Sequence, residues 1–416
     1  MGQTIKIFQQ TFWQVLGKVI TSLSTFIILA LVTRNYGKEG TGVFTLALTY
    51  LSIFYILADF GFNAHVLSRA QGLGYRVQGE WNKLLGTRLV WSGILVVVAV
   101  GLLPFWPFST PAFTKAVSFG SLAILASAAF ITCNLIFQSK LRYDLSVLAS
   151  SVGTLIGLAI FIYLSTSKSP IYLLVLAHMI SWAVISLIAV LLIHKFLRNV
   201  FPIFDFHYAK DLFKQSWPVA ATLSLNVLYF RADSFMVAYF KSVADAGVYN
   251  VAYSVFQSAL VLPTFIMNAY YPLMLRSLDK FKLIAFGLVG LSVMGTFITI
   301  VFAPFIINIL TGGGFSGSIV SLQILSLGFP AYFLSSLLMW LLIAKGKYKI
   351  MFLLYMSGLI FNLTLNLLYI PQYSYFAASW ITVISEYLIL LMQVVALSFW
   401  GRAERGIQNR ILDKPE

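Results

Sequence analysis

Charged residues are scarce in this 416-residue chain. Only 10% of its residues are charged and 60% are hydrophobic, whereas soluble domains carry about 25% charged residues. Uncharged runs such as Leu89–Thr114, Ala116–Ser139 and Leu145–Ser167 exceed the roughly 18 residues that cross a bilayer as a helix, and Leu283–Ala344 is long enough for two crossings. The composition therefore excludes a soluble globular domain and predicts a polytopic membrane protein.

The residues that enzymes and cofactor sites use are also few. The single cysteine, Cys133, excludes an intramolecular disulfide and reads as a buried packing residue, because it lies in an apolar run. Gly312-Gly313-Gly314 is not followed by Gly-Lys-Ser/Thr, so it is no phosphate-binding loop. We find no cluster of histidine and cysteine at metal-ligand spacing and no nucleophile triad. We therefore expect no cofactor, no metal and no enzymatic activity.

The apolar runs predict an all-α membrane protein with about twelve transmembrane helices. Continuously apolar segments favour helices, because a membrane β-barrel would show short strands of alternating character. We expect two six-helix lobes at residues 1–200 and 216–400, a cytoplasmic linker at 201–215 and a cytoplasmic tail at 401–416. The expected spans are 9–33, 40–63, 84–106, 115–137, 147–166, 170–194, 216–240, 246–271, 283–304, 317–343, 348–369 and 375–399.

A weak internal repeat relates the two predicted lobes. When the chain is shifted by 205 residues, Thr41–Asn63 lies over Ala246–Asn268 without a gap, and each segment is the second span of its lobe. The identical pairs are Gly42/Gly247, Val43/Val248, Ala47/Ala252, Leu57/Leu262, Phe60/Phe265 and Asn63/Asn268. Six spans per lobe make this a parallel repeat, which implies a pseudo-two-fold axis along the membrane normal and a substrate site between the lobes.

Basic residues fall mainly on one side of this arrangement of spans. The chain has 28 Lys and Arg against 13 Asp and Glu. Five basic residues lie on the outer side and Lys18 and Arg231 lie within spans, while all the others fall on the side of the two termini. The outer five are Arg34, Lys38, Lys115, Lys168 and Lys241. Because basic loops stay in the cytoplasm, both termini are predicted to be cytoplasmic, and the net charge of +15 does not indicate a nucleic-acid partner.

A few ionisable residues lie inside the predicted spans. Lys18, Arg231, Asp233 and Glu386 would each cost about 3 kcal/mol at mid-bilayer, so such groups normally face a cavity or a partner. Arg231 and Asp233 are two residues apart and point in different directions on a helix, so Asp233 needs another partner, such as Lys18 or a coupling ion. The alternative is a buried ion-pair network that locks helices together, and for Lys18 it is snorkelling to the headgroups.

Other polar residues in the spans have structural and functional interpretations. Asp59 lies near the cytoplasmic edge of the second span, where it could bond a helix end or loop, or take part in ion coupling. His178 could relay protons, although a bond to a neighbouring helix is the commoner state of a lone buried histidine. Asn362 and Asn366 share one helix face at i, i+4 and could join helices by hydrogen bonds.

Several short motifs resemble the polysaccharide biosynthesis or O-antigen flippase family (Wzx-like) of the multidrug/oligosaccharidyl-lipid/polysaccharide (MOP) exporter superfamily. They are RNYGKEGTGVF at Arg34–Phe44, ADFGF at Ala58–Phe62, RAD at Arg231–Asp233, AGVYNVA at Ala246–Ala252, KGK at Lys345–Lys347, Asn362 and Asn366, IP at Ile370–Pro371 and TVISE at Thr382–Glu386. The chain departs from the family pattern after Pro371, where Tyr373-Ser374-Tyr375-Phe376 stand in place of glycines. The shape of this turn is therefore left open.

This resemblance implies a MATE/MOP-like bundle and a lipid-linked oligosaccharide flippase. Such a protein moves undecaprenyl-diphosphate-linked sugar repeat units across the bacterial inner membrane for O-antigen or other polysaccharide synthesis. The implied mechanism is alternating access driven by H⁺ or Na⁺ without ATP, with membrane lipids and a polysaccharide polymerase as further partners. We predict that Arg231 and Lys18 bind the diphosphate, because guanidinium and ammonium groups bind phosphate, and that Asp233, Glu386 and Asp59 take part in ion coupling.

Two other function classes remain open from the sequence. A MATE-like drug or metabolite:cation antiporter would share the architecture and the buried charges. A membrane polysaccharide polymerase is less favoured, because such enzymes carry a large outer loop with catalytic Arg or His, and the outer loops predicted here are short and contain no histidine. A transport assay that compares lipid-linked sugar with organic cations would separate the first two classes.

Overall fold

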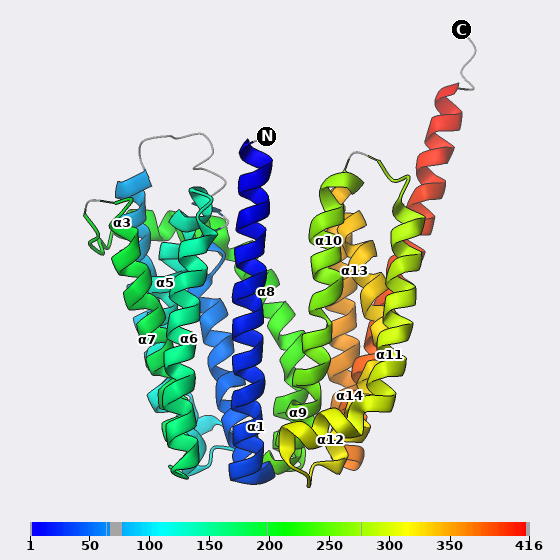
Figure 1. Ribbon diagram of the computed structural model, residues 1–416. Coiled ribbons are helices and arrows are strands. Elements are labelled where there is room, and N and C mark those ends of the chain that lie inside the picture. The colour runs from blue at the N-terminus through cyan, green and yellow to red at the C-terminus, as the bar shows by residue number, and fades with distance from the viewer. Residues whose placement is uncertain (1, 64, 67–76, 198, 276, 413–416) are drawn as a thin grey trace. The chain divides into compact units, whose positions relative to one another are not determined.

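The computed structural model describes residues 2–63, 65–66, 77–197, 199–275 and 277–412. Every element in this part of the chain is a helix, which confirms the predicted all-α class (Figure 1). The elements are α1 (Gly2–Asp59), α3 (Val77–Gly101), η1 (Leu103–Phe105), α4 (Pro111–Gly120), α5 (Leu122–Ser139), α6 (Tyr143–Thr166), α7 (Ile171–Ile193), α8 (Phe206–Phe240), α9 (Val243–Ala259), α10 (Val261–Met274), α11 (Phe281–Thr311), α12 (Ser316–Ser326), α13 (Phe329–Ala344) and α14 (Tyr348–Leu412).

The chain forms two compact units. Unit 1 comprises Met1–Arg231 with Leu310–Gly312, and unit 2 comprises Ala232–Ile309 with Gly313–Glu416. In unit 1, α6 packs on α7 and α1, and α5 packs on α7 and α3. In unit 2, α13 packs on α14, and α12 packs on α9 and α14. The predicted lobe boundaries at residues 200 and 216 and the pseudo-two-fold axis stay predictions.

The helices are long and apolar enough to cross a membrane. Among the described residues, eight helices meet this criterion, or nine if the bent pair of α12 and α13 counts as one span. Two of the eight, Phe12–Asp59 and Lys349–Ser398, have 48 and 50 residues. A helix of that length measures about 70 Å, far more than the roughly 30 Å of a bilayer core. The chain is therefore a multi-pass membrane protein, and the count of twelve spans stays a prediction.

Each of these two long helices is interrupted by a single non-helical residue. In α1 the residue is Gly37, with φ 62° and ψ −163°, which lies between the predicted spans 9–33 and 40–63. In α14 it is Ser374, with φ 54° and ψ −140°, which lies between the predicted spans 348–369 and 375–399. A reversal of the chain at these two positions explains how a nominally continuous helix can hold two membrane spans.

The conformation of Ser374 defines the turn after Pro371, whose shape the sequence left open because the glycines of the family pattern are missing. Its backbone conformation is one that normally only glycine adopts, and it costs another residue about 1–3 kcal/mol. The Ser374 hydroxyl donates a hydrogen bond of 2.8 Å to Oδ2 of Asp245, in the first turn of α9. The tight turn that glycines would form is thus present, and a tertiary hydrogen bond offsets part of its strain.

Other predicted spans are divided into two consecutive helices. The span 115–137 corresponds to α4 and α5, the span 246–271 to α9 and α10, and the span 317–343 to α12 and α13. The axes of α12 and α13 are bent by 45°. Pro330 lies in the first turn of α13. At the start of a helix its missing N–H is tolerated, whereas within a continuous helix from α12 to α13 it would remove a backbone hydrogen bond.

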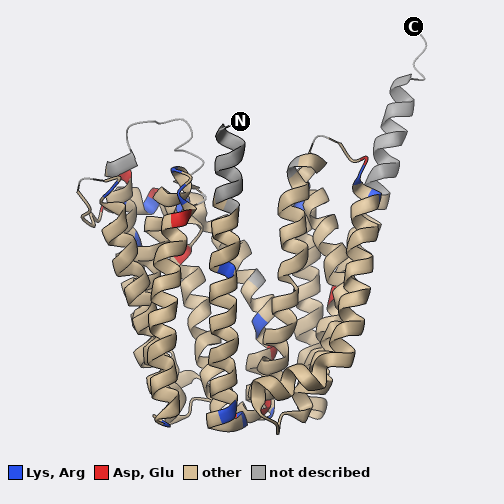
Figure 2. Ribbon diagram, viewed as in Figure 1, with Lys and Arg blue, Asp and Glu red and all other residues tan. Residues whose placement is uncertain are grey.

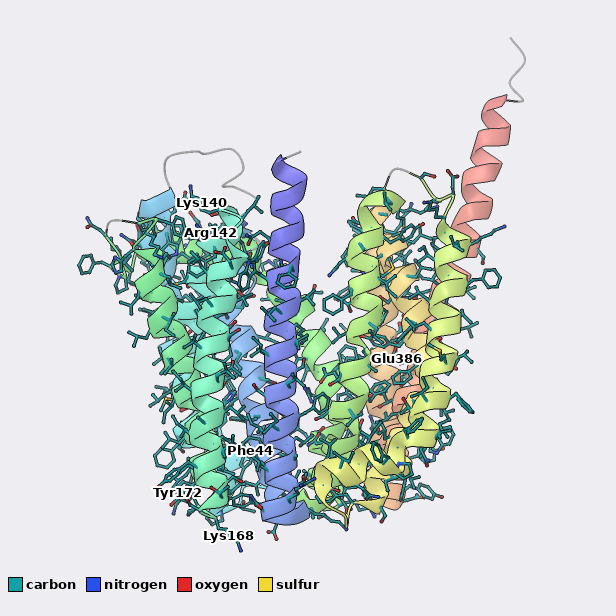
Figure 3. The ribbon with its side chains drawn as sticks, viewed as in Figure 1. Phe44, Lys140, Arg142, Lys168, Tyr172 and Glu386 are labelled. Atoms are coloured by element: carbon teal, nitrogen blue, oxygen red, sulfur yellow. The ribbon has the colours of Figure 1, made fainter. Side chains whose placement is uncertain are left out.

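Charged residues lie mainly at the ends of the helices within each unit, and only a few lie along their middle (Figure 2). In unit 1, Lys140 and Arg142 precede α6 while Lys168 follows it, so that they occupy opposite ends of the bundle, as the span assignment predicts (Figure 3). The predicted cytoplasmic residues Arg69, Arg76, Arg198, Arg276 and Lys414 lie outside the described residues.

Cys133 is fully buried in the core of unit 1, which confirms its predicted packing role.

Two backbone segments of unit 1 approach each other closely. Segment 199–205 runs over α3, where the Ile203 amide donates to the Asn82 carbonyl at 3.0 Å. A Cβ atom at Gly86 would lie 2.7 Å from the Ile203 nitrogen and closer still to its carbonyl group. Glycine at position 86 is therefore what allows this segment to pack on α3.

Gly86→Ala is expected to destabilise the protein by about 1–3 kcal/mol, because overpacking against a backbone forces the segment away from α3. Gly93→Ala is the matched control in the same helix, since a Cβ there meets nothing within 4 Å. That change should be neutral or stabilise by up to about 1 kcal/mol, because glycine is a poor helix former. Thermal unfolding in detergent measures both, and equal unfolding temperatures for the two variants would contradict the packing argument.

Candidate functional site

The most deeply buried cation in the described part of unit 1 is Arg88, on α3. Its side chain is 0% exposed. Nη1 donates to Oδ1 of Asn63 and to Oγ1 of Thr132, both at 3.0 Å. Nη2 donates at 3.3 Å to both the backbone carbonyl and Oδ1 of Asp59, at the end of α1. Arg88 therefore joins the second predicted span to α3 and α5 at a single point.

Aromatic residues surround this ion pair. The Arg88 guanidinium lies 5.4 Å from the centre of the Phe62 ring. Phe60, Phe62 and Trp91 each contact the Phe213 ring in edge-to-face geometry, with centroids about 5 Å apart. Phe213 lies in the first turns of α8. The aromatic rings thus shield the Arg88 guanidinium from water and attach the start of α8 to unit 1.

Arg88 is a buried charge that the sequence does not single out. By sequence it counts among the basic residues on the side of the two termini, because it lies only four residues inside the predicted span 84–106. A signal was nevertheless present, since both Arg88 and Asp59 fall inside predicted spans. The structure supports the helix-bonding interpretation of Asp59, whose side chain is 30% exposed, and its role in ion coupling stays a prediction.

In unit 2, Asp233 of α8 lies in a buried cluster of hydroxyl and amide groups. Its side chain is 2% exposed. Oδ2 accepts hydrogen bonds from the Tyr249 hydroxyl at 2.7 Å and the Thr382 hydroxyl at 2.9 Å. The neighbouring Ser234 hydroxyl donates to Oδ1 of Asn250 at 2.6 Å. Asp233 is thus held by side chains of α9 and α14. Their hydrogen bonds replace those that water would otherwise donate to the carboxylate.

The second half of α14 carries a further acid, Glu386, which is 4% exposed. It lies about midway along the helices of unit 2 (Figure 3). Its carboxyl group interacts electrostatically with Tyr332 of α13 and Tyr355 of the first half of α14. The depth and burial of Glu386 agree with its predicted place near the centre of the last span.

Asn362 and Asn366 join the two halves of α14, as the sequence predicted. The Asn366 amide donates to Oδ1 of Asn362 at 2.8 Å, and the Asn362 amide donates to the Ser385 hydroxyl at 3.1 Å. All three side chains are buried. The prediction of interhelical hydrogen bonds is confirmed, and the bonds place residue 362 opposite residue 385.

Lys18 and Arg231, the predicted diphosphate ligands, are less buried than the acids. Lys18 is exposed on α1 and Arg231 is half-buried on α8, both in unit 1. The compact units divide directly after Arg231, so Asp233 belongs to unit 2. The hydrogen bonds that hold Asp233 come from α9 and α14, as expected if residues at i, i+2 point in different directions.

His178 is bonded within unit 1, which confirms the structural interpretation of this residue. Its Nε2 lies 3.3 Å from the Tyr55 hydroxyl of α1, and it accepts a hydrogen bond of 3.2 Å from Nε1 of Trp182. Trp182 follows His178 by one turn on α7. Since Nε2 is an acceptor here, the imidazole proton resides on Nδ1.

An ion pair outside the membrane spans fixes the segment before α8. Nζ of Lys83 lies 2.6 Å from Oδ2 of Asp205, and the Tyr208 amide donates to Oδ1 of Asp205 at 3.1 Å. The Lys83 hydrogen bond, followed by the Tyr208 amide, lowers the pKa of Asp205 from its ordinary value. A depressed carboxyl pKa contributes stability at neutral pH that is lost as the pH falls through the folded-state pKa.

Within the described residues, no group of three His, Cys, Asp or Glu side chains could hold a metal ion.

Comparisons with known proteins place these features in a family. The sequence model of the family described as "Polysaccharide biosynthesis protein" matches residues 7–278. A Shigella dysenteriae protein named "Putative O-antigen transporter" is 23% identical over 392 residues, which cover 92% of this chain and 96% of that protein.

Solved structures share the fold. The lipid II flippase MurJ in an inward closed conformation matches with a TM-score of 0.72 and 15% identity, over 93% of this chain and 87% of that one. An inward-facing multidrug resistance MATE family transporter of the MOP superfamily matches with a TM-score of 0.69 and 13% identity, over 94% and 96%. The Vibrio cholerae MATE transporter VcmN matches with a TM-score of 0.64 and 16% identity, over 96% and 97%.

Proposed function

We propose that this chain, which belongs to the polysaccharide biosynthesis protein family, is a flippase for undecaprenyl-diphosphate-linked sugar repeat units. The single observation that carries the proposal is the family match, which extends through both predicted RNYGKEG and RAD motifs to residue 278. The name of the Shigella dysenteriae relative points to O-antigen as one class of product. The protein would act in the bacterial inner membrane with both termini in the cytoplasm, together with a polysaccharide polymerase that receives the translocated units.

A flippase must carry a charged head group through a region without water. The isoprenoid tail can stay in the bilayer, whereas the diphosphate and sugar need polar partners along the way. Arg231 is suited to the diphosphate, because its guanidinium presents a fork of donors and stays charged when it is half-buried. Lys18, exposed on α1, supplies a second, more flexible positive charge. We assign these two residues to the diphosphate.

Ion coupling is assigned to the acids of the spans, with H⁺ or Na⁺ as the driving ion. Asp233 and Glu386 are buried at 2% and 4% exposure, and intramembrane acids in transporters commonly mark ion pathways. Asp59 is a weaker candidate, because Arg88 already lies next to its carboxylate. A bound cation would change the hydrogen bonds that Tyr249 and Thr382 make to Asp233, and so could alter how α8, α9 and α14 pack.

Arg231→Ala is expected to lower the affinity for undecaprenyl diphosphate by about 10- to 100-fold, because a charge-assisted hydrogen bond contributes about 1.5–3 kcal/mol. Arg231→Lys keeps the charge but not the fork, and should fall between Ala and the natural residue. Binding of undecaprenyl diphosphate to the purified full-length protein measures the effect, and surface polysaccharide in cells reports its consequence.

Lys241→Ala is the control, since Lys241 is an exposed residue just after the same helix and should leave both measurements unchanged. Normal polysaccharide export by Arg231→Ala at the natural protein level would overturn the assignment of Arg231. Transport of organic cations by the natural protein in liposomes, with no movement of lipid-linked sugar, would instead establish the drug antiporter.

A further inference from the structure

The segment between α7 and α8 is fixed to α3 through its backbone. The Ile203 amide donates to the Asn82 carbonyl at 3.0 Å. The side-chain amide of Asn82, in the orientation that matches donors to acceptors, donates to the Asn199 and Phe201 carbonyls at 3.2 and 3.3 Å. Glycine at position 86 leaves room for this approach. The segment therefore has a defined conformation on α3, although it is not helical.

The large apolar side chains of this segment are turned away from the protein. Their exposed fractions are 67% for Phe201, 46% for Ile203, 52% for Phe204 and 68% for Phe206. Such contiguous apolar surface marks an interaction site. Lipid tails cover the exposed apolar residues of the spans, but these four residues lie between the predicted spans 170–194 and 216–240. They therefore need a partner outside the hydrocarbon core of the bilayer.

The segment lies at the end of unit 1 that carries Lys140 and Arg142 (Figure 3). Helix α6 runs from these two residues to Lys168, and α7 returns, so the chain after α7 is back at the first end (Figure 1). Its basic residues predict that this end is cytoplasmic. At the end of a transmembrane bundle, an amphipathic segment can bury aromatic rings at the boundary between headgroups and acyl chains.

Lysine side chains flank the apolar residues in the sequence. The lysines of residues 194–215 are all exposed, and they are Lys195, Lys210 and Lys214. Two acids share this stretch, Asp211 and Asp205, but Asp205 is already paired with Lys83 at 2.6 Å. Lys210 and Lys214 are one turn apart on α8 and share a face, whereas Leu212 is buried in the core of unit 1. This combination of lysines and aromatic rings is complementary to a lipid surface of negative charge.

We propose that segment 199–206, with Lys195, Lys210 and Lys214, is an interfacial anchor that binds the anionic phospholipid surface at this end of unit 1. The three phenylalanine rings enter the boundary between headgroups and acyl chains, and the lysines contact headgroup phosphates. Because α8 begins at Phe206, the anchor sets the depth at which this helix starts in the membrane. The binding involves no transported substrate and so does not depend on the proposed function.

Spin labels on the full-length protein in lipid vesicles test where the segment lies. The natural protein should take no label, because Cys133 is its single cysteine and is 0% exposed. A nitroxide on Phe204→Cys should be more accessible to oxygen, which concentrates in hydrocarbon, than to a neutral nickel chelate, which stays in water. The matched control is Glu39→Cys, an exposed position close to the interruption of α1 at Gly37, where the nickel chelate should have the better access.

The charge of the lipid is tested with vesicles of phosphatidylcholine that contain increasing shares of phosphatidylglycerol. The label at residue 204 should enter the lipid boundary at a lower share of phosphatidylglycerol in the natural background than in Lys195→Gln/Lys210→Gln/Lys214→Gln. Each lysine should contribute about fivefold to the affinity for the anionic surface, and all three about a hundredfold.

The matched charge control is Lys38→Gln/Lys168→Gln/Lys241→Gln. It removes three exposed lysines from the opposite, outer side of the predicted spans and should leave the label at residue 204 unchanged. If the variant without Lys195, Lys210 and Lys214 does not fold, salt takes its place. About 1 M salt shortens the Debye length to about 3 Å and should draw the label at residue 204 toward water.

Two outcomes would overturn the proposal. A label at residue 204 that stays more accessible to the nickel chelate than to oxygen in phosphatidylglycerol vesicles would exclude the anchor, and the apolar surface would then be left for a protein partner. A label that enters the lipid boundary equally with and without phosphatidylglycerol, and that neither the lysine substitutions nor salt displace, would exclude the recognition of anionic lipid.

Discussion

Asp59→Asn is expected to destabilise the protein by about 3–5 kcal/mol, because it leaves a fully buried arginine without its counter-ion. Arg88 is 0% exposed, whereas the Asp59 side chain is 30% exposed. Arg88→Met should therefore cost less, about 1–3 kcal/mol, since the remaining carboxylate is partly hydrated. Unfolding of the purified protein in detergent, followed by circular dichroism, measures both variants.

The double variant Asp59→Asn/Arg88→Met provides the control. Replacing both members of a buried ion pair by uncharged groups is often close to neutral, so the double variant should be more stable than Asp59→Asn alone. If Asp59→Asn and Arg88→Met cost the same and their effects add in the double variant, then the two side chains are not energetically coupled. The ion pair would then have no role in joining α1 to α3.

Asp233→Asn is expected to reduce polysaccharide export by about a hundredfold or more, which is near the upper range of site-to-site coupling. The amide oxygen can still accept hydrogen bonds from Tyr249 and Thr382, so the stability should change by less than about 1 kcal/mol. Asp233→Ala should lose export equally and also cost about 1–3 kcal/mol, because the Tyr249 hydroxyl is left without its acceptor. Polysaccharide export in cells measures the functional effect, and the unfolding temperature in detergent measures the effect on stability.

Ser234→Ala is the matched control, because it removes the neighbouring hydrogen bond to Asn250 without changing charge. It should cost about 1 kcal/mol and leave export intact. Normal export by Asp233→Asn would mean that the carboxylate only packs unit 2. In that case ion coupling would have to be sought in Glu386 or in Asp59.

The sequence predicted the helices well because hydrophobic length is a local property. A stretch such as residues 147–166 is uncharged and mainly apolar, and its length fits a single membrane-spanning helix. The structure has α6 there. The breaks between α4 and α5 and between α9 and α10 were not predicted. The break between α4 and α5 depends on how neighbouring helices pack, whereas the break before α10 has a sequence sign in Pro263, the third residue of that helix.

The polar contacts were harder to predict because they join distant parts of the chain. Thr382 lies 149 residues from Asp233, and only the fold brings the two together. Asn362 and Asn366 were identified correctly because their i, i+4 spacing is visible in the sequence, although their partner Ser385 was not. Arg88 was counted only as a basic residue on the side of the termini, because its position near the end of a span cannot distinguish a snorkelling arginine from a buried one.

The turn at Ser374 has a consequence for how the protein is made. The two halves of α14 meet through Asn362 and Ser385, which are only 23 residues apart. Contacts between residues this close in the chain form quickly and lose little loop-closure entropy. The last two spans can therefore pair as soon as both have emerged from the ribosome and entered the bilayer, and their buried amides need not wait for other helices to shield them from lipid.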